Sequence, residues 1–444
     1  MDDVGGEMTR MAPGSSSLSQ IRFSRRSACG ALLALAGWPA AAQFRVEISG
    51  VGATQLPIAV VRFRDEDKTN QSPSAIIRAD LERSGAFRIV DTGSTSFDEA
   101  SRPDIAQWRG RAADALVGGS VTRLADGRYD IRFKLWDVVK GSELGGQSNA
   151  VEASELRLAA HRIADFIYEK LTGEKGVFST RIAYVTHSGQ RYTLRVADAD
   201  GENGQVALNS GQPIISPAWS PNGKELAYVS FERQKAVVFV HTVATGERRA
   251  IADFRGSNSA PAWAPDGQTL AVTLSRESGS QIFLISRNGE NVRRLTTSQA
   301  IDTEPVFMPD GRTIYFVSDR GGGPQIYRVP VAGGGVERVT FNGVYNISPA
   351  ISPDGRMLAY IARLGNAFRL HTQELTAGAQ PTALTDTGDD ESPSFAPNGR
   401  LIIYATRAQG RDVLMTTTLD GKIKARLASA GADVREPVWG PFGR

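Results

Sequence analysis

The chain has 444 residues, enough for two or three domains, and its 51 basic side chains nearly balance its 48 acidic ones. This balance excludes the strongly basic footprint by which nucleic-acid-binding proteins are recognised, so no nucleic acid is expected as a partner. The single cysteine, Cys29, excludes a disulfide framework within the chain.

Residues 1–42 have the pattern of an export signal. Arginines at 22, 25 and 26 precede an apolar run over residues 28–38, and a run of small residues ends at Ala42. We expect cleavage between Ala42 and Gln43, which would release a periplasmic chain without cysteine. The apolar run is short for a membrane-spanning helix, so a retained anchor is the less favoured alternative. The general secretory route is favoured, and the twin-arginine route stays open, as does a later start codon.

Residues 43–55 would form the start of the mature chain. Apolar and polar side chains alternate here as in a half-exposed strand, in the order Phe44, Arg45, Val46, Glu47, Ile48, Ser49. Glycines at 50 and 52 follow, and the segment begins at a newly cut end, so we expect it to be mobile. It can pair with its own domain or leave it. An ordinary first strand, held permanently, is the alternative.

Residues 56–172 predict a small α/β domain. An apolar strand over 56–63 is followed by a helix that Ser72 caps, Pro73 begins and Gly85 ends. A strand over 87–90, a short helix over 104–113 and a hairpin over 115–137, turning at Asp126-Gly127, come next. An amphipathic helix over 154–171 ends at Gly173, and residues 173–180 are expected to be a linker.

Residues 181–444 contain a repeat of constant period. An eight-residue phrase such as Ala260-Pro-Ala-Trp-Ala-Pro-Asp-Gly occurs six times, 44 residues apart, and an apolar run follows each Asn-Gly or Asp-Gly turn or its equivalent. Two strands joined by a tight turn, repeated at this spacing, are typical of a β-propeller blade. The sequence therefore predicts six blades of four antiparallel strands.

The two ends of the repeat segment are out of phase. It begins with a second strand at Ile182 and ends with an inner strand over residues 437–441. We expect the C-terminal strand to complete the first blade, because this removes two exposed strand edges. The recurrent aromatic residues are expected to pack between neighbouring blades: Trp219, Trp263, Phe307, Phe395 and Trp439.

Catalytic patterns are missing from the sequence. No G-x-S-x-G motif occurs, and the histidines at 161, 187, 241 and 371 are not at metal-ligand spacing, so they are expected to be surface or helix residues. Acidic clusters at 302 with 304, 389–391, and 433 with 436 precede inner strands and would ring one mouth of the channel. They are expected to be solvated loop charges, with a bound cation as the alternative. No enzyme activity, cofactor or metal is predicted; a hydrolase or lyase that uses these carboxylates is the alternative.

Taken together, the phrase repeat, the out-of-phase ends, the preceding α/β domain, the export signal and Arg181-Ile-Ala-Tyr-Val-Thr resemble the TolB family of the periplasmic Tol-Pal system. The resemblance covers the whole mature chain. It implies a non-enzymatic, monomeric scaffold without a transmembrane span, which supports outer-membrane integrity and constriction during cell division. It also implies that residues 44–49 bind TolA and that the propeller binds the peptidoglycan-associated lipoprotein Pal.

The loops that lead into the inner strands differ most between repeats, and varied loops on a rigid scaffold are where binding specificity resides. Resemblance and position together assign the Pal contact to Ser257, Asn258, Ala260, Thr303 and Glu304. Position extends the candidate set to the equivalent loops, at Tyr345, Asn346, Asp390 and Arg435.

Overall fold

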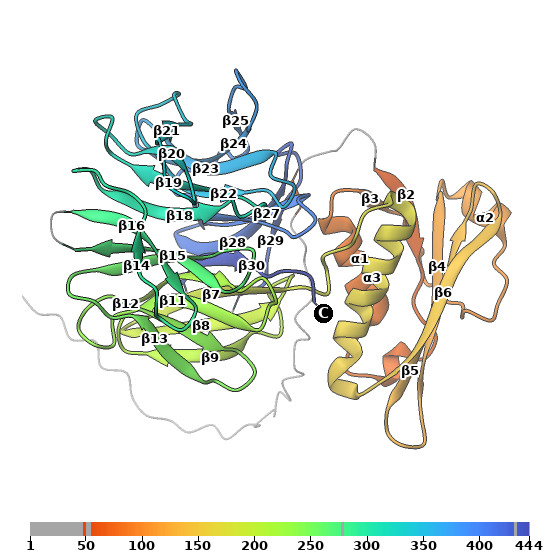
Figure 1. Cartoon of the computed structure of the whole chain (residues 1–444). Helices are drawn as coiled ribbons and strands as arrows, with labels where there is room; N and C mark the ends of the chain where they lie inside the picture. Colours follow the sequence, from red (N-terminus) through yellow and green to blue (C-terminus); the bar gives the residue numbers. More distant parts are fainter. Residues whose placement is uncertain (1–47, 50–54, 277–278, 430–432, 444) are drawn as a thin grey trace, which may run out of the picture. The chain divides into compact units, whose positions relative to one another are not determined.

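The computed structural model describes residues 48–49, 55–276, 279–429 and 433–443. The predicted export signal and residues 43–47 lie outside this range. Within it, no helix is both long and apolar enough to cross a membrane. The described chain contains a small α/β domain and a propeller (Figure 1).

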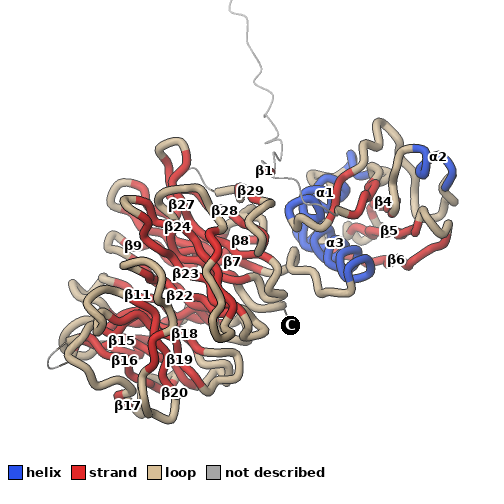
Figure 2. Tube along the Cα trace, turned by 90° about the horizontal axis from the view of Figure 1, so that it is seen from above, coloured by secondary structure: helices blue, strands red, loops and turns tan. Residues whose placement is uncertain are grey.

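The α/β domain has one five-stranded sheet in the order β3-β2-β4-β5-β6. β2 pairs in parallel with β3 and β4, and the remaining neighbours are antiparallel. Helices α1 and α3 lie together on one face of the sheet (Figure 2). The elements are β2 (Leu56–Val60), η1 (Glu66–Lys68), α1 (Pro73–Arg83), β3 (Phe87–Ile89), α2 (Ile105–Gly110), β4 (Ala115–Arg123), β5 (Tyr129–Asp137), β6 (Ser142–Val151), η2 (Ala153–Glu155) and α3 (Leu156–Thr172).

Two details of this domain differ from the expectation. The edge strand β6 was not predicted, because its polar and glycine-rich sequence lacks apolar alternation and its side chains are mostly exposed. The side chain of Ser72 does not cap α1. Its hydroxyl instead donates to the buried carboxylate of Glu66 (3.1 Å), which accepts the N–H of Ser74 (3.0 Å). Glu66 therefore supplies the acceptor at the helix N-terminus that the sequence pattern assigned to Ser72.

The propeller has six antiparallel blades of four strands each, as predicted. Blade 1 contains β30 (Asp433–Trp439), β7 (Arg181–Ser188), β8 (Arg191–Asp198) and β9 (Gln205–Ser210), and blade 2 contains β10 (Ile214–Trp219), β11 (Glu225–Ser230), β12 (Val237–Thr242) and β13 (Arg248–Ala252). Blade 3 contains β14 (Asn258–Trp263), β15 (Thr269–Ser275), β16 (Ser280–Ser286) and β17 (Arg293–Arg294), and blade 4 contains β18 (Asp302–Phe307), β19 (Thr313–Ser318), β20 (Gln325–Pro330) and β21 (Glu337–Arg338). Blade 5 contains β22 (Asn346–Ile351), β23 (Met357–Leu364), β24 (Ala367–Glu374) and β25 (Thr382–Ala383), and blade 6 contains β26 (Glu391–Phe395), β27 (Leu401–Ala408), β28 (Arg411–Thr418) and β29 (Lys424–Arg426).

Every inner strand has a bulge at the residue before its first proline. The pairing register shifts there in all six blades. Because proline has no N–H to give to the ladder, a bulge is one of the few places where a strand accepts it. The preceding residues all have left-handed backbone angles, with φ between 47° and 55°: Ser216, Ala260, Glu304, Ser348, Ser392 and Glu436.

The C-terminal strand closes the ring as predicted. β30 pairs with β7 in blade 1, with Val438 opposite Ala183 and Trp439 opposite Ile182. The indole N–H of Trp439 donates to the hydroxyl of Thr180 (2.8 Å). The five recurrent aromatic residues are all buried, and Trp263 donates to the backbone of Ala218 in the preceding blade (3.2 Å). These contacts confirm that the aromatic residues pack between blades.

A short strand near the N-terminus extends blade 6. β1 (Ile48–Ser49) pairs antiparallel with the outer strand β29, with Ile48 opposite Ala425 and Ser49 opposite Lys424. Part of the segment that was expected to be mobile is therefore added to a propeller edge rather than to the α/β sheet.

Candidate partner-binding face of the propeller

The residues before the first prolines of all six repeats line a single central cavity of about 390 Å³. The inner strands therefore run in the same direction and begin at one end of the propeller, which we call the loop face. All nine candidate Pal-binding residues lie at or next to the start of an inner strand. The structure thus brings them to one face, but it places their side chains in three different environments.

Three of the nine candidates are buried and hold loops in place. The Asn258 side chain accepts the N–H of Phe254 (3.0 Å) and donates to the carbonyls of Ala236, Phe254 and Gly256. Asn346 donates to Gln325 and to the carbonyl of Asn342, both at 2.8 Å. In the equivalent position, Asp390 accepts the N–H of Leu370 (3.0 Å). These buried side chains therefore fix the conformation of the loops through hydrogen bonds and do not form an exposed surface.

Two candidates, Ala260 and Glu304, line the cavity. The Glu304 carboxylate accepts the N–H of Ser348 (2.6 Å), and the equivalent Glu436 accepts the N–H of Ser216 (3.3 Å). Burial raises the pKa of both carboxyls above the usual range, although these hydrogen bonds lower it, and the negative charge of Glu304 raises that of Glu436 further. The expectation of solvated loop charges is wrong for these two residues, because the bulge directs this position of the repeat into the channel.

The same correction applies to Asp302, which is fully buried and accepts two hydrogen bonds of 2.9 Å from Arg320. Glu391, another member of the predicted acidic clusters, borders a second cavity of about 340 Å³. One of its carboxylate oxygens is buried without a hydrogen-bond partner. Burial, reinforced by the negative charge of Glu436, raises the pKa of Glu391 to about 7.

The four remaining candidates are accessible in whole or in part. Ser257 and Arg435 are exposed, and Arg435 donates to Asp412 (2.9 Å), while Thr303 and Tyr345 are half-buried.

Sequence reasoning missed three exposed apolar side chains on the same face. Ile301, Val344 and Leu364 have exposed fractions of 54%, 77% and 46%. Ile301 and Val344 precede inner strands, and Leu364 ends β23, so all three lie at the loop face.

The histidines depart from the expectation in part. His161 lies in a helix as predicted, but it is fully buried, and His241 and His371 are buried in strands rather than being surface or helix residues. Asp80, His161 and Asp200 are close enough together to hold a metal ion. However, Arg83 and Arg157 already bond the two carboxylates, so guanidinium groups supply the positive charge that a cation would bring.

These features define a class of protein: a closed six-bladed propeller that follows a small α/β domain in the chain, with varied loops and three exposed apolar side chains on one face. The TolB beta propeller domain family matches residues 168–443, and the TolB amino-terminal domain family matches residues 44–144. The chain belongs to the TolB family.

Individual relatives agree with this assignment. The crystal structure of TolB from Acinetobacter baumannii is 36% identical, covers 90% of this chain and 100% of its own, and superposes with a TM-score of 0.82. The Tol-Pal system protein TolB of Albidiferax ferrireducens is 69% identical over 50% of this chain and 52% of its own length. The Tol-Pal system protein TolB of Polaromonas naphthalenivorans is 64% identical over 54% of this chain and 56% of its own length. The chain thus spans about half the length of the curated relatives it matches.

Proposed function

We propose that this chain is a periplasmic scaffold of the Tol-Pal system that binds Pal at the loop face and TolA through residues 43–55. It performs no chemistry of its own. In this role it supports outer-membrane integrity and constriction during cell division, as an exported monomer cleaved after Ala42. The proposal is supported by the relatives, which are named Tol-Pal system protein TolB. The observation that carries the Pal contact is the exposure of Ile301, Val344 and Leu364 beside the varied loops.

A protein partner suits this face better than a small molecule does. Exposed apolar side chains on a soluble protein often mark protein contacts, and those at the centre of an interface contribute most of its affinity. Thr303 lies beside Ile301 at the start of β18, and Val344 precedes β22 in the next blade. A flat partner surface that covered both blades would bury these residues together.

Replacing Val344 by Glu, or Thr303 by Arg, is expected to weaken Pal binding about tenfold or more, because each change leaves a charge desolvated in the interface. Calorimetric titration with purified Pal measures this effect. The control is Val139→Glu, since Val139 is 62% exposed in the α/β domain. Wild-type affinity in both loop-face variants, with the fold intact by circular dichroism, would place the Pal contact elsewhere.

The TolA contact is proposed to form by strand addition. Residues 48–49 already add to the edge of β29, so this backbone is able to extend a sheet. We expect a peptide of residues 43–55 to bind the C-terminal domain of TolA, with modest affinity because the segment must become ordered. A mature chain that lacks these residues should lose TolA in a pull-down and retain Pal. Capture of TolA by the shortened chain would rule this mechanism out.

A further inference from the structure

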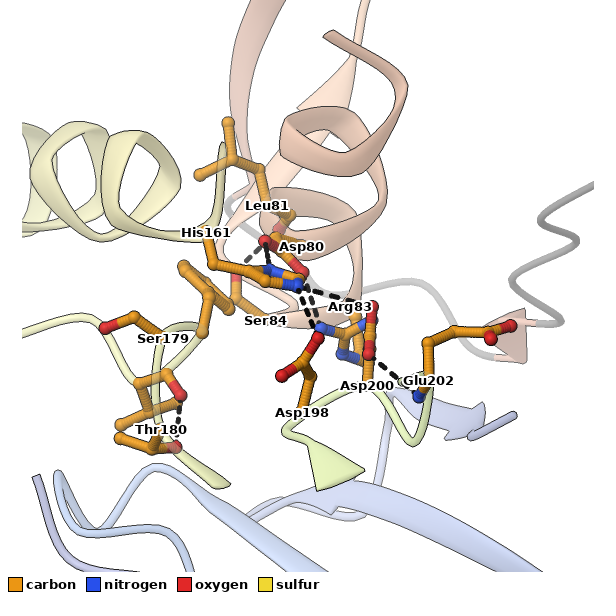
Figure 3. A network of polar contacts seen from close by, with 12 residues as sticks. Asp80, Leu81, Arg83, Ser84, His161, Ser179, Thr180, Asp198, Asp200 and Glu202 are labelled. Carbon is orange, nitrogen blue, oxygen red and sulfur yellow. Dashed lines mark hydrogen bonds and ion pairs between the residues drawn. The ribbon is translucent and has the colours of Figure 1, made fainter. Parts of the chain in front are cut away.

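A buried, charged contact joins the α/β domain to blade 1 (Figure 3). Helix α1 contributes Asp80, and helix α3 contributes His161 and Arg157. Asp198 is the last residue of β8, and Asp200 lies in the turn that follows. Asp80 and His161 are fully buried, and Asp200 is 1% exposed. The proposed binding of Pal and TolA assigns no role to this cluster.

The two nitrogens of His161 have different surroundings. Nδ1 donates to Asp80 (2.6 Å), and the other oxygen of Asp80 bonds Arg83 (2.6 Å). Nε2 is buried without a hydrogen-bond partner and faces the turn, 3.7 Å from an oxygen of Asp200 and 3.9 Å from an oxygen of Asp198.

Without a proton on Nε2, the charged groups nearest His161 leave an excess of negative charge. Asp80, Asp198 and Asp200 carry three negative charges, and Arg83 and Arg157 carry two positive ones. Because an uncompensated buried charge is strongly unfavourable, a doubly protonated imidazole is the species that fits. Two more carboxyls belong to the same electrostatic environment. Asp165 on α3 accepts the backbone N–H groups of residues 178 and 179, and Glu202 follows the turn.

The turn that faces His161 also contacts the chain just after β29, the strand that pairs with β1. The carbonyl of Asp200 accepts the N–H of Ala428 (3.1 Å). At Gly201, a Cβ atom would approach the Ala428 carbonyl to 2.1 Å, so the two backbones are in direct contact. Ala428 is two residues beyond β29, whose outer edge pairs with β1. A shift of this turn would therefore reach β29.

We propose that His161 is a proton-dependent latch between the two domains. With both ring nitrogens protonated, it ties α1 to the turn of Asp198 and Asp200, and through that turn it steadies β29 and the docked strand β1. Loss of the Nε2 proton leaves the cluster with a net negative charge and loosens both contacts. The latch operates in the free chain and does not depend on which partners the chain binds.

The direction of the pH dependence follows from the neighbouring groups. Burial is the largest single effect and lowers the pKa of His161, but Asp80 and Asp200 together raise it by more than burial and Arg157 lower it, so the pKa lies above its usual value. The latch is therefore complete below the ordinary histidine pKa of about 6.5 and is lost as the pH rises through the higher folded value. Burial also raises the pKa of Asp198, which acts in the same direction. His161 and Arg83 lower the pKa of Asp80 against the effect of its burial, so Asp80 stays ionised where the latch titrates.

Amide hydrogen exchange of the full chain between pH 6 and pH 9, corrected for intrinsic rates, tests the latch. In the wild type, the protection of residues 198–201 and of β29 is expected to fall about tenfold as the pH rises. A tenfold loss corresponds to a difference of about one unit between the pKa of His161 in the closed and in the opened state. In His161→Asn, protection should be low throughout and change less than twofold. The matched control is His187→Asn, since His187 stacks on Tyr192 at the end of β7 and should keep the wild-type profile.

Asp200→Asn provides a second variant of nearly unchanged size. Removing one carboxylate should move the midpoint of the protection profile to lower pH, and an NMR titration of the imidazole carbons should show the same shift for His161. A pH-independent wild-type profile, or a His161 pKa at or below the ordinary value, overturns the proposal. An unshifted midpoint in Asp200→Asn overturns it also, even where His161→Asn fails to fold.

Discussion

A chain that lacks residues 436–444 is expected to lose the cooperative folding of its propeller. The deletion removes most of β30, the only inner strand that blade 1 has, and leaves the paired edge of β7 open. It also removes the buried side chain of Trp439, and truncating a buried tryptophan alone costs about 3–5 kcal/mol. The deletion therefore removes part of the hydrophobic core of blade 1 together with the backbone pairing between β30 and β7.

Thermal unfolding followed by calorimetry measures this effect. The melting temperature of the deletion variant is expected to fall by about 10 °C or more. Deleting only residues 443–444 is the control, because Gly443 is exposed and a Cβ atom there would contact nothing within 4 Å. Trp439→Ala should give an intermediate loss. An unchanged melting temperature after the longer deletion would contradict closure by β30.

Asn258→Ala is expected to destabilise the chain by about 3 kcal/mol, although this residue was predicted as a binding residue. The substitution removes one acceptor and the donor to three carbonyls, and each buried backbone group left unsatisfied costs about 1–3 kcal/mol. The neighbouring Ser257 is exposed, so Ser257→Ala should change stability by less than about 0.5 kcal/mol. Urea unfolding of the two variants measures the difference.

The same pair of variants separates a supporting residue from a contact residue. If Asn258 holds the loop, its removal should lower stability first and Pal affinity only as a consequence. Wild-type stability with weakened Pal binding in Asn258→Ala would instead show that this side chain touches the partner directly. The half-buried Thr303 is predicted to behave in the opposite way, with affinity lost and stability retained.

The sequence by itself determined the architecture of the propeller. The 44-residue period, the Asp-Gly turns and the unpaired ends predicted six blades closed by β30, and the structure confirms each point. Such patterns succeed because they act locally: a glycine turn joins adjacent strands, and an alternating strand buries one face whatever its distant neighbours are. The packing of Trp263 between blades was correctly predicted because an aromatic residue recurs at this position of the repeat.

Only the tertiary structure decided which loop residues face outward. The bulge before each proline changes the register, so Glu304 lines the channel while Thr303 stays accessible, and no local pattern shows this. The Asp80–His161 contact joins residues 81 positions apart, and the turn at Asp200 lies in another domain. The net charge of a buried cluster depends on every charged group that the fold brings together. These groups come from distant parts of the chain, so no local sequence pattern predicts it.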